Sequence, residues 1–368
     1  MKRLYLHIGT HKTGSTAIQH ALRANRKKIE SHGCALIPYP PASRQLMIDS
    51  AENMHTIDLA RNQLQLTLRH PLRRRKAQYV MSWEGFSGDP WHGYYNTGVV
   101  AKSLRAITLG LDVTIIVYLR RQDDFVESLY TQSIQKGHSS SFADFVAQFG
   151  KDCFNWRELV KHYEDCFGEG NVIPRRYHEM FLPDRQSLLR DFSETINLPF
   201  ILALPGSDLR NPSMSRQALE IARVTNPYLS SEQQKCLRTI LQKSNAKELF
   251  EAFGFFDISS RDEFLSRHAA SNASINLKYF GDSSGPLFPA PSALPGEEGS
   301  DVPVGTTVNA GEVVANIIRF LHAQGKISEI ERKPDRLIKS AAEALTRHPR
   351  LHRLMRFLVR GLLSQLIQ

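Results

Sequence analysis

Hydrophobic residues begin as a short continuous run and then recur at helical spacing. Residues 3–8 are mostly aliphatic or aromatic and end at Gly9, a pattern typical of a buried strand. Apolar residues then recur every three or four positions over residues 17–29, and Gly33 stands where a glycine commonly ends a helix. Residues 35–37 are a second candidate strand. A β-loop-α-β unit of this kind normally belongs to a parallel sheet, so we predict an α/β fold.

Three further runs extend the predicted sheet. Residues 78–82, 113–119 and 172–173 are candidate strands, and the second is a nearly continuous β-branched run that suits a central strand covered on both faces. Helical patterns follow it at residues 123–136, 142–149, 156–167 and 186–196. We therefore expect a central parallel sheet flanked by helices.

The last quarter of the chain differs in composition. The segment 281–311 contains five prolines and six glycines, and residues 326–368 contain ten Lys or Arg against four Asp or Glu. We predict an α/β domain over residues 1–288, a Pro/Gly-rich linker or loop over 289–311, and a basic helical tail over 312–368. A basic amphipathic helix in this tail would lie on an anionic membrane, pack on its own domain, or contact a second subunit.

Composition and charge narrow the classes of function. The 368 residues are 41% hydrophobic with a net charge of +10, which indicates a globular protein with an anionic partner. Four widely spaced cysteines exclude a dense disulfide framework and a four-cysteine zinc site. No signal-peptide core and no window of about 20 apolar residues occur. We expect a cytoplasmic location, with the inner membrane face as an alternative, and no nucleic-acid partner, because no recognition motif accompanies the charge.

A glycine-containing loop joins the first predicted strand to the first helix. Its backbone N–H groups and the positive helix end would form an anion cradle, to which Lys12 adds a full charge and Ser15 and Thr16 add hydroxyls. A Walker A loop places its lysine after the second glycine, whereas here the lysine comes first. This order argues for a related loop that binds a different phosphate group, against the alternative of a turn that only caps a helix. The loop reads Gly9-Thr10-His11-Lys12-Thr13-Gly14-Ser15-Thr16.

This loop resembles the 5′-phosphosulfate loop of sulfotransferases that use PAPS (3′-phosphoadenosine 5′-phosphosulfate). The likeness is strongest to the bacterial branch related to carbohydrate and heparan sulfate sulfotransferases, with a P-loop-type sheet. It implies a second motif, in which an arginine at a strand end and a serine eight residues later hold the 3′-phosphate. Arg120 and Ser128 match that motif, although Arg121 is an alternative. The implied donor-binding residues are His11, Lys12, Thr13, Gly14, Ser15, Thr16, Arg120 and Ser128.

The chemistry requires stabilisation of the leaving group and a base. Lys12 would neutralise charge on the bridging oxygen, and because a sulfuryl group carries little negative charge, we expect no metal. Glu84 follows a predicted strand and resembles the glutamate base of the carbohydrate branch. The alternative bases are His11, His20 and His92, and the structural alternative for Glu84 is a salt bridge.

The resulting hypothesis is transfer of a sulfuryl group from PAPS to a hydroxyl or amine of a carbohydrate or lipid-linked glycan. Lys12 and Glu84 would be its catalytic residues. The alternatives are a P-loop nucleotide kinase and a non-catalytic module that binds a nucleotide or an anionic glycan. Because fold does not determine the acceptor, the sequence leaves its identity open.

Overall fold

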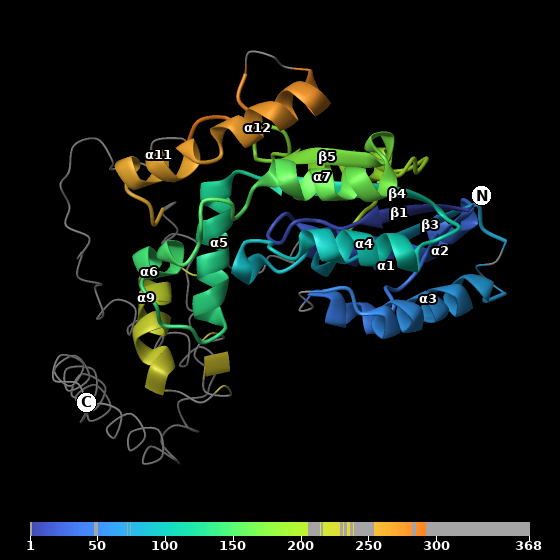
Figure 1. The fold of residues 1–368 in the computed structure, drawn as a ribbon, viewed down its shortest axis with the longest axis horizontal. Helices are drawn as coiled ribbons and strands as arrows, with labels where there is room; N and C mark the ends of the chain where they lie inside the picture. The colour runs from blue at the N-terminus through green and yellow to red at the C-terminus, as the bar shows by residue number, and fades with distance from the viewer. Residues whose placement is uncertain are drawn as a thin grey trace, which may run out of the picture. The chain divides into compact units, whose positions relative to one another are not determined.

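A five-stranded parallel sheet lies at the centre of the computed structural model (Figure 1). Its strand order is β2-β3-β1-β4-β5, and every neighbouring pair is parallel. This confirms the predicted fold class. The strands are β1 (Arg3–His7), β2 (Cys34–Leu36), β3 (Gln78–Ser82), β4 (Asp112–Arg120) and β5 (Val172–Tyr177). The structure describes residues 2–47, 51–71, 73, 75–204, 214, 216–228, 231, 234–235, 238, 254–281 and 285–291.

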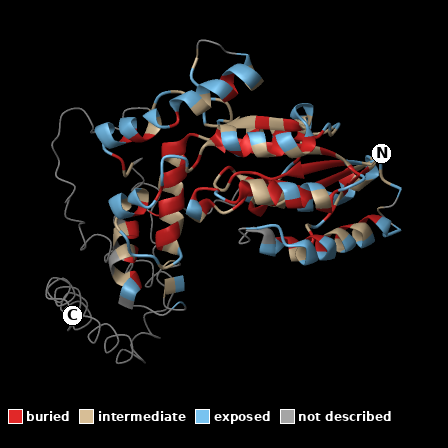
Figure 2. Ribbon diagram, viewed as in Figure 1, coloured by how far each residue is buried: buried red, intermediate tan, exposed pale blue. Residues whose placement is uncertain are grey.

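Helices cover both faces of the sheet. On one face, a core cluster joins strand residues such as Tyr5 and Tyr118 to α1 (Ser15–Ala24), α2 (Arg26–Ser31) and α8 (Arg185–Thr195). Another layer, in which adjacent helices contact one another, contains α3 (Met54–Arg69), α4 (Thr97–Ile107) and α7 (Trp156–Phe167), and α7 also contacts β4 and β5. Buried residues accordingly concentrate in the strands and on the inner sides of these helices (Figure 2).

Contacts divide the chain into two units. One unit contains the sheet and comprises Met1–Leu129, Phe145–Leu209 and Phe256–Pro291. The other comprises Tyr130–Asp144, Arg210–Phe255 and Ser292–Gln368, and within it the Tyr130 ring packs edge-on against Phe142 and Phe255. The predicted linker beyond residue 291 and the predicted basic tail lie outside the described residues. The remaining helices are α5 (Gln122–Gln135), α6 (Phe142–Ala147), α9 (Arg216–Thr225), α11 (Ile258–Ser266) and α12 (Ala269–Ile275).

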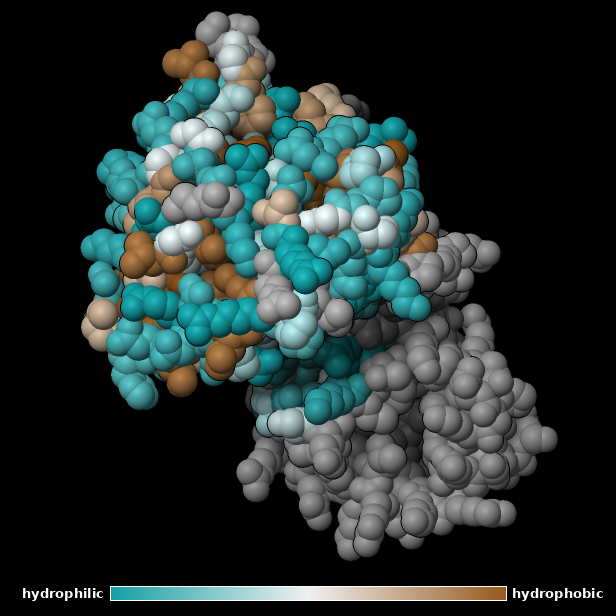
Figure 3. Space-filling model, turned by 90° about the vertical axis from the view of Figure 1, so that its right-hand side faces the viewer, coloured by the Kyte–Doolittle hydropathy of each residue, from teal (hydrophilic) through white to brown (hydrophobic). Residues whose placement is uncertain are grey.

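The surface of the described part is mixed in character. Seen from the right-hand side of Figure 1, where the chain starts, hydrophilic residues predominate and smaller hydrophobic areas lie between them (Figure 3). Among the described residues, no helix combines the length and the apolar character needed to cross a bilayer.

All five strands coincide with predicted ones, whereas the helices coincide only in part. The helix expected over residues 17–29 is interrupted at Asn25, whose side-chain amide donates to the carbonyl oxygens of Ala21 and Ala203 at 2.8 and 2.7 Å. Helices α3, α4, α9, α11 and α12 were not predicted. The buried face of α4 includes Val100, Leu104 and Ile107, which already have helical spacing in the sequence.

Candidate functional site

The predicted phosphate loop leaves the sheet beside the end of β4. From β1 the chain crosses to β2 on one side of β1, while β4 lies on the other side. The loops after β1 and β4 therefore emerge at a topological switch point. Ligands of α/β sheets usually bind at such a point. Directly after β1, the Ile8 N–H donates to the carbonyl oxygen of Ile116 at 3.0 Å. The Thr10 hydroxyl donates to the carbonyl oxygen of Tyr118 at 2.8 Å. The loop is thereby fixed along β4.

The loop backbone has the conformation of an anion cradle. Positive φ angles occur at Gly9 (46°), Lys12 (65°) and Gly14 (77°), as in backbone turns that bind anions. The N–H groups of Thr10 and His11 donate to Tyr118 and Tyr94, so the anion site would be formed by the N–H groups at the start of α1. Gly14 is the N-cap of α1 and has no side chain to cap it, so the N–H groups of Ser15 and Thr16 have no intrahelical acceptor. A Cβ at Gly14 would lie 2.5 Å from Leu188 Cδ2, which explains the need for glycine.

Two buried polar atoms beside Gly9 lack a hydrogen-bond partner among the described residues. They are Ser15 Oγ, in a residue that is 5% exposed, and His7 Nε2. A Cβ at Gly9 would lie 2.6 Å from the first atom and 3.2 Å from the second. An unpaired buried hydroxyl is costly, and at the start of α1 it suits a phosphate or phosphosulfate oxygen. The residues of the loop therefore fit the nucleotide that the resemblance implies.

His7 is a residue that the sequence analysis missed. It ends β1, and its Nδ1 lies 2.7 Å from Ser82 Oγ at the end of β3. Complete burial lowers the pKa of His7 to about 3, so the ring is neutral. A histidine inside an otherwise apolar strand was the signal in the sequence.

The two candidate arginines at the end of β4 have different environments. Arg120 Nη1 donates to the carbonyl oxygen of Lys12 at 3.1 Å, and Arg120 forms no ion pair with any carboxylate that the structure describes. Arg121 is buried and donates to Asp123 at 2.6 and 3.0 Å and to Asp124 at 3.1 Å. Arg121 is therefore neutralised within the protein, and the alternative that it binds a phosphate is not supported by the structure.

Ser128 lies on α5, one helical turn beyond Asp124 and on the same face. Burial and Asp123 raise the pKa of Asp124, while the charges of Arg121, Arg120 and His178 lower it in part. The Ser128 side chain is half-buried.

His178 is a second residue that the sequence analysis missed. It follows Tyr177, which pairs in register with Arg120 on the neighbouring strand. Burial, with the charges of Arg121 and Arg120, lowers the pKa of His178. Its Nδ1 accepts a hydrogen bond from the N–H of Met180 at 3.2 Å, so the neutral ring carries its proton on Nε2.

Glu84 lies near the same end of the sheet. It comes two residues after β3, and Trp83 N–H donates to the carbonyl oxygen of His7 at 3.1 Å. Gln19, one turn beyond Ser15 on α1, donates from Nε2 to Glu84 Oε2 at 2.7 Å. The partner of the Glu84 carboxylate is thus a neutral amide. The structural alternative, in which a salt bridge holds Glu84, does not describe this contact.

The alternative histidine bases lie in different settings. Tyr94 Oη accepts a hydrogen bond from His11 N–H at 3.0 Å and lies 3.1 Å from His11 Nδ1. His92 pairs with Asp89 at 2.6 Å, and its side chain is 73% exposed. His20 is half-buried on α1. Among the described residues, no group of three or more His, Cys, Asp or Glu side chains is arranged to hold a metal ion.

Comparisons with known proteins give limited similarity. No protein-family model matches the chain. An uncharacterized protein of Archaeoglobus fulgidus is 26% identical over 169 residues, which are 45% of this chain and 46% of the relative, so the chain spans about half of that relative's length. A sulfotransferase from Alicyclobacillus acidocaldarius, known from its crystal structure, has a TM-score of 0.36 and 15% identity over 61% of this chain and 94% of that one. These similarities do not assign the chain to a family.

Proposed function

We propose that the protein transfers the sulfuryl group of PAPS to a hydroxyl or amine of a carbohydrate or lipid-linked glycan. The loop around Lys12 would hold the 5′-phosphosulfate, and Arg120 with Ser128 would hold the 3′-phosphate. Glu84 would be the base. This proposal unites the loop around Lys12 and the motif from Arg120 to Ser128 in the binding of one ligand.

The observation that carries the proposal is the hydrogen bond between Arg120 Nη1 and the Lys12 carbonyl oxygen at 3.1 Å, across 108 positions of the chain. It joins the loop after β1 to the end of β4. A nucleotide with phosphates at both the 3′ and the 5′ position of its ribose needs two anion-binding groups near each other. An arginine without a carboxylate partner is suited to bind one of these phosphates.

In the proposed reaction, an acceptor hydroxyl attacks sulfur while the bond from sulfur to the bridging oxygen of the donor breaks. Glu84 takes the hydroxyl proton, the acceptor becomes a sulfate ester, and adenosine 3′,5′-bisphosphate (PAP) leaves. Lys12 balances the charge that develops on the bridging oxygen, and the N–H groups at the start of α1 orient the phosphate.

Calorimetric titration of the wild-type protein with PAP and with ADP tests this function. We expect PAP to bind at least about tenfold more tightly than ADP, because one additional charge-assisted contact contributes about 1.5–3 kcal/mol. Equal affinities, or ADP binding that requires Mg²⁺, would favour the kinase alternative. A protein that binds neither nucleotide would contradict the proposal.

Replacing Ser15 by alanine should have opposite effects on stability and on binding. The change removes an unpaired buried hydroxyl, so the free energy of unfolding should rise by up to about 1 kcal/mol, while PAP should bind roughly tenfold more weakly. Thermal unfolding and calorimetry measure the two effects. Ser193→Ala is the matched control. The Ser193 hydroxyl donates to the carbonyl oxygen of Leu189 at 2.6 Å and accepts from the N–H of Leu202 at 2.9 Å. This variant should therefore lose stability and keep its PAP affinity. Unchanged PAP binding by Ser15→Ala would remove Ser15 from the site.

A further inference from the structure

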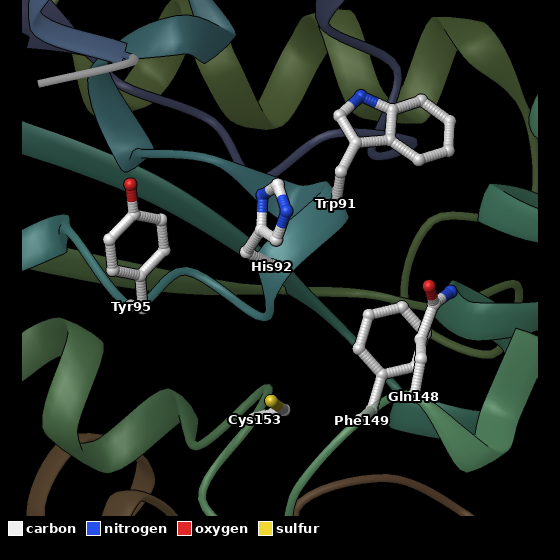
Figure 4. A pocket seen from close by; sticks show the side chains of 6 residues that line it. All are labelled: Trp91, His92, Tyr95, Gln148, Phe149 and Cys153. Carbon is white, nitrogen blue, oxygen red and sulfur yellow. The ribbon is translucent and has the colours of Figure 1, made fainter. Parts of the chain in front are cut away.

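An open cavity of about 410 Å³ lies between two segments of the sheet-containing unit. Trp91, His92 and Tyr95 line it from the turn that includes η3 (Pro90–His92), and residues 148–153 line it from the other side. Figure 4 shows these side chains around the open space. The second side consists of Gln148, Phe149 and Cys153. We refer to this cavity as the aromatic pocket.

Residues that adjoin the two lining segments in the sequence are hydrogen-bonded to the candidate site. Tyr94 lies between the lining residues His92 and Tyr95, and its Oη accepts from His11 N–H at 3.0 Å. Trp156 lies three residues after Cys153, and its Nε1–H donates to the carbonyl oxygen of Arg120 at 2.8 Å. Tyr94 and Trp156 also pack together, with ring centroids 5.8 Å apart. Both lining segments are thus connected through these neighbours to the chain of the two anion-binding motifs.

The lining favours a neutral ligand over an anion. His92 is the only lining residue with an ordinary basic side chain, and it is paired with Asp89 at 2.6 Å. Burial raises the pKa of the Cys153 thiol, which therefore stays neutral. Three aromatic side chains offer apolar faces, and amide, imidazole and phenol groups offer hydrogen bonds. Tyr95 is 58% exposed although it is aromatic, as in a site built to receive a ligand.

We propose that the aromatic pocket binds an uncharged sugar ring of the acceptor, with the ring faces against Trp91 and Tyr95 and its hydroxyl groups toward Gln148 and His92. This inference rests on the proposed sulfuryl transfer, and it specifies the acceptor further. The sugar unit in the pocket is neutral, even where the rest of the glycan or its lipid carrier is charged.

Cys153 provides a reporter for the test. Alkylation of Cys153 by iodoacetamide is followed by mass spectrometry in PAP-saturated protein, with Cys166 as the internal reference thiol. The probes are cellotetraose, maltotetraose and chitotetraose at millimolar concentration, with a heparin tetrasaccharide as the anionic comparison. We expect at least one neutral probe to slow alkylation of Cys153 and to leave Cys166 unchanged.

Variants separate binding in the pocket from nonspecific effects. Trp91→Ala should lower the affinity for the protecting sugar about tenfold, as truncation of an aromatic anchor typically does. Trp91→Phe should retain most of this affinity. Leu66→Ala changes an exposed apolar residue of α3 outside the pocket and should have no effect. All three variants should bind PAP as the wild type does.

Two results would overturn the inference: protection of Cys153 by none of the neutral probes, or protection by the heparin fragment alone. Failure of the proposed function gives a different result. If the wild-type protein does not bind PAP but a neutral probe protects Cys153, the pocket binds sugars and the sulfuryl transfer proposal is wrong. If PAP binds and no neutral probe protects, only the pocket assignment is wrong.

Discussion

Replacing Lys12 by methionine should lower the turnover number for PAPS-dependent sulfuryl transfer by about 10²- to 10³-fold, the usual cost of removing one group that stabilises charge in a transition state. The negative charge on the bridging oxygen is greatest as its bond to sulfur breaks, so the loss should be larger in turnover than in PAP affinity. Methionine keeps an unbranched side chain that is one atom shorter and carries no charge. The measurement is the rate of PAP formation at saturating PAPS with an acceptor that supports wild-type turnover.

Two further variants make the Lys12 result specific. Lys12→Arg keeps the positive charge and should recover part of the lost rate, since a guanidinium replaces the ammonium at a different distance. Lys161→Met removes an exposed lysine from α7 that pairs with Asp165 at 3.9 Å, and it should leave turnover unchanged. A Lys12→Met protein with near wild-type turnover would show that Lys12 does not act on the leaving group.

Replacing Glu84 by glutamine should lower turnover by about 10²- to 10⁴-fold, the contribution typical of a positioned base. In the wild type, Gln19 Nε2 donates to Glu84 Oε2 at 2.7 Å. Glutamine at this position retains an oxygen that can accept the same hydrogen bond, so the local structure should persist. The affinity for PAP should stay unchanged, because the base faces the acceptor. Steady-state rates at several pH values measure the effect.

The histidine alternatives give a different pattern. If His11, His20 or His92 is the base, Glu84→Gln keeps its turnover and the corresponding histidine-to-alanine variant loses it. Glu30→Gln serves as a control, because Glu30 is on α2 and forms an i,i+4 pair with Arg26 at 2.9 Å. It should match the wild type in both turnover and pH profile.

The strands of this fold could be predicted because each is a short run of apolar residues with a polar or glycine boundary. The strongest run, residues 113–119, is indeed inside β4, which pairs with both β1 and β5. Helix α3 was harder to predict, because its buried stripe, which includes Ile57, Leu64 and Leu68, is narrow, and apolar residues such as Leu59 and Leu66 also lie on its exposed surface. The pattern of a single sequence emphasises continuous runs and underestimates such surface helices.

The sequence indicates candidate site residues only where they lie next to one another along the chain. The loop around Lys12 and the motif from Arg120 to Ser128 have local signatures. The choice of Arg120 over Arg121 depends on Asp123 and Asp124, whose side chains fold back on Arg121. The spacing of these residues in the sequence does not reveal that the two aspartates contact Arg121.

Tertiary contacts determine the rest of the site. His7 meets Ser82 across 75 positions, and Tyr94 meets His11 across 83. These pairs form because parallel strands bring their ends together, and a search for local motifs does not detect them. His178 was missed for the same reason, since it reaches the site through the pairing of β5 with β4.

The central claim is that the Lys12 loop and Arg120 hold opposite ends of one nucleotide. The most direct test is calorimetric titration of the wild-type, Arg120→Ala and Lys12→Ala proteins with PAP and with AMP, which lacks the 3′-phosphate. We predict that Arg120→Ala weakens PAP binding by about 10- to 100-fold and leaves AMP binding nearly unchanged, whereas Lys12→Ala weakens both ligands alike. An equal loss of PAP and AMP affinity in Arg120→Ala would contradict the claim.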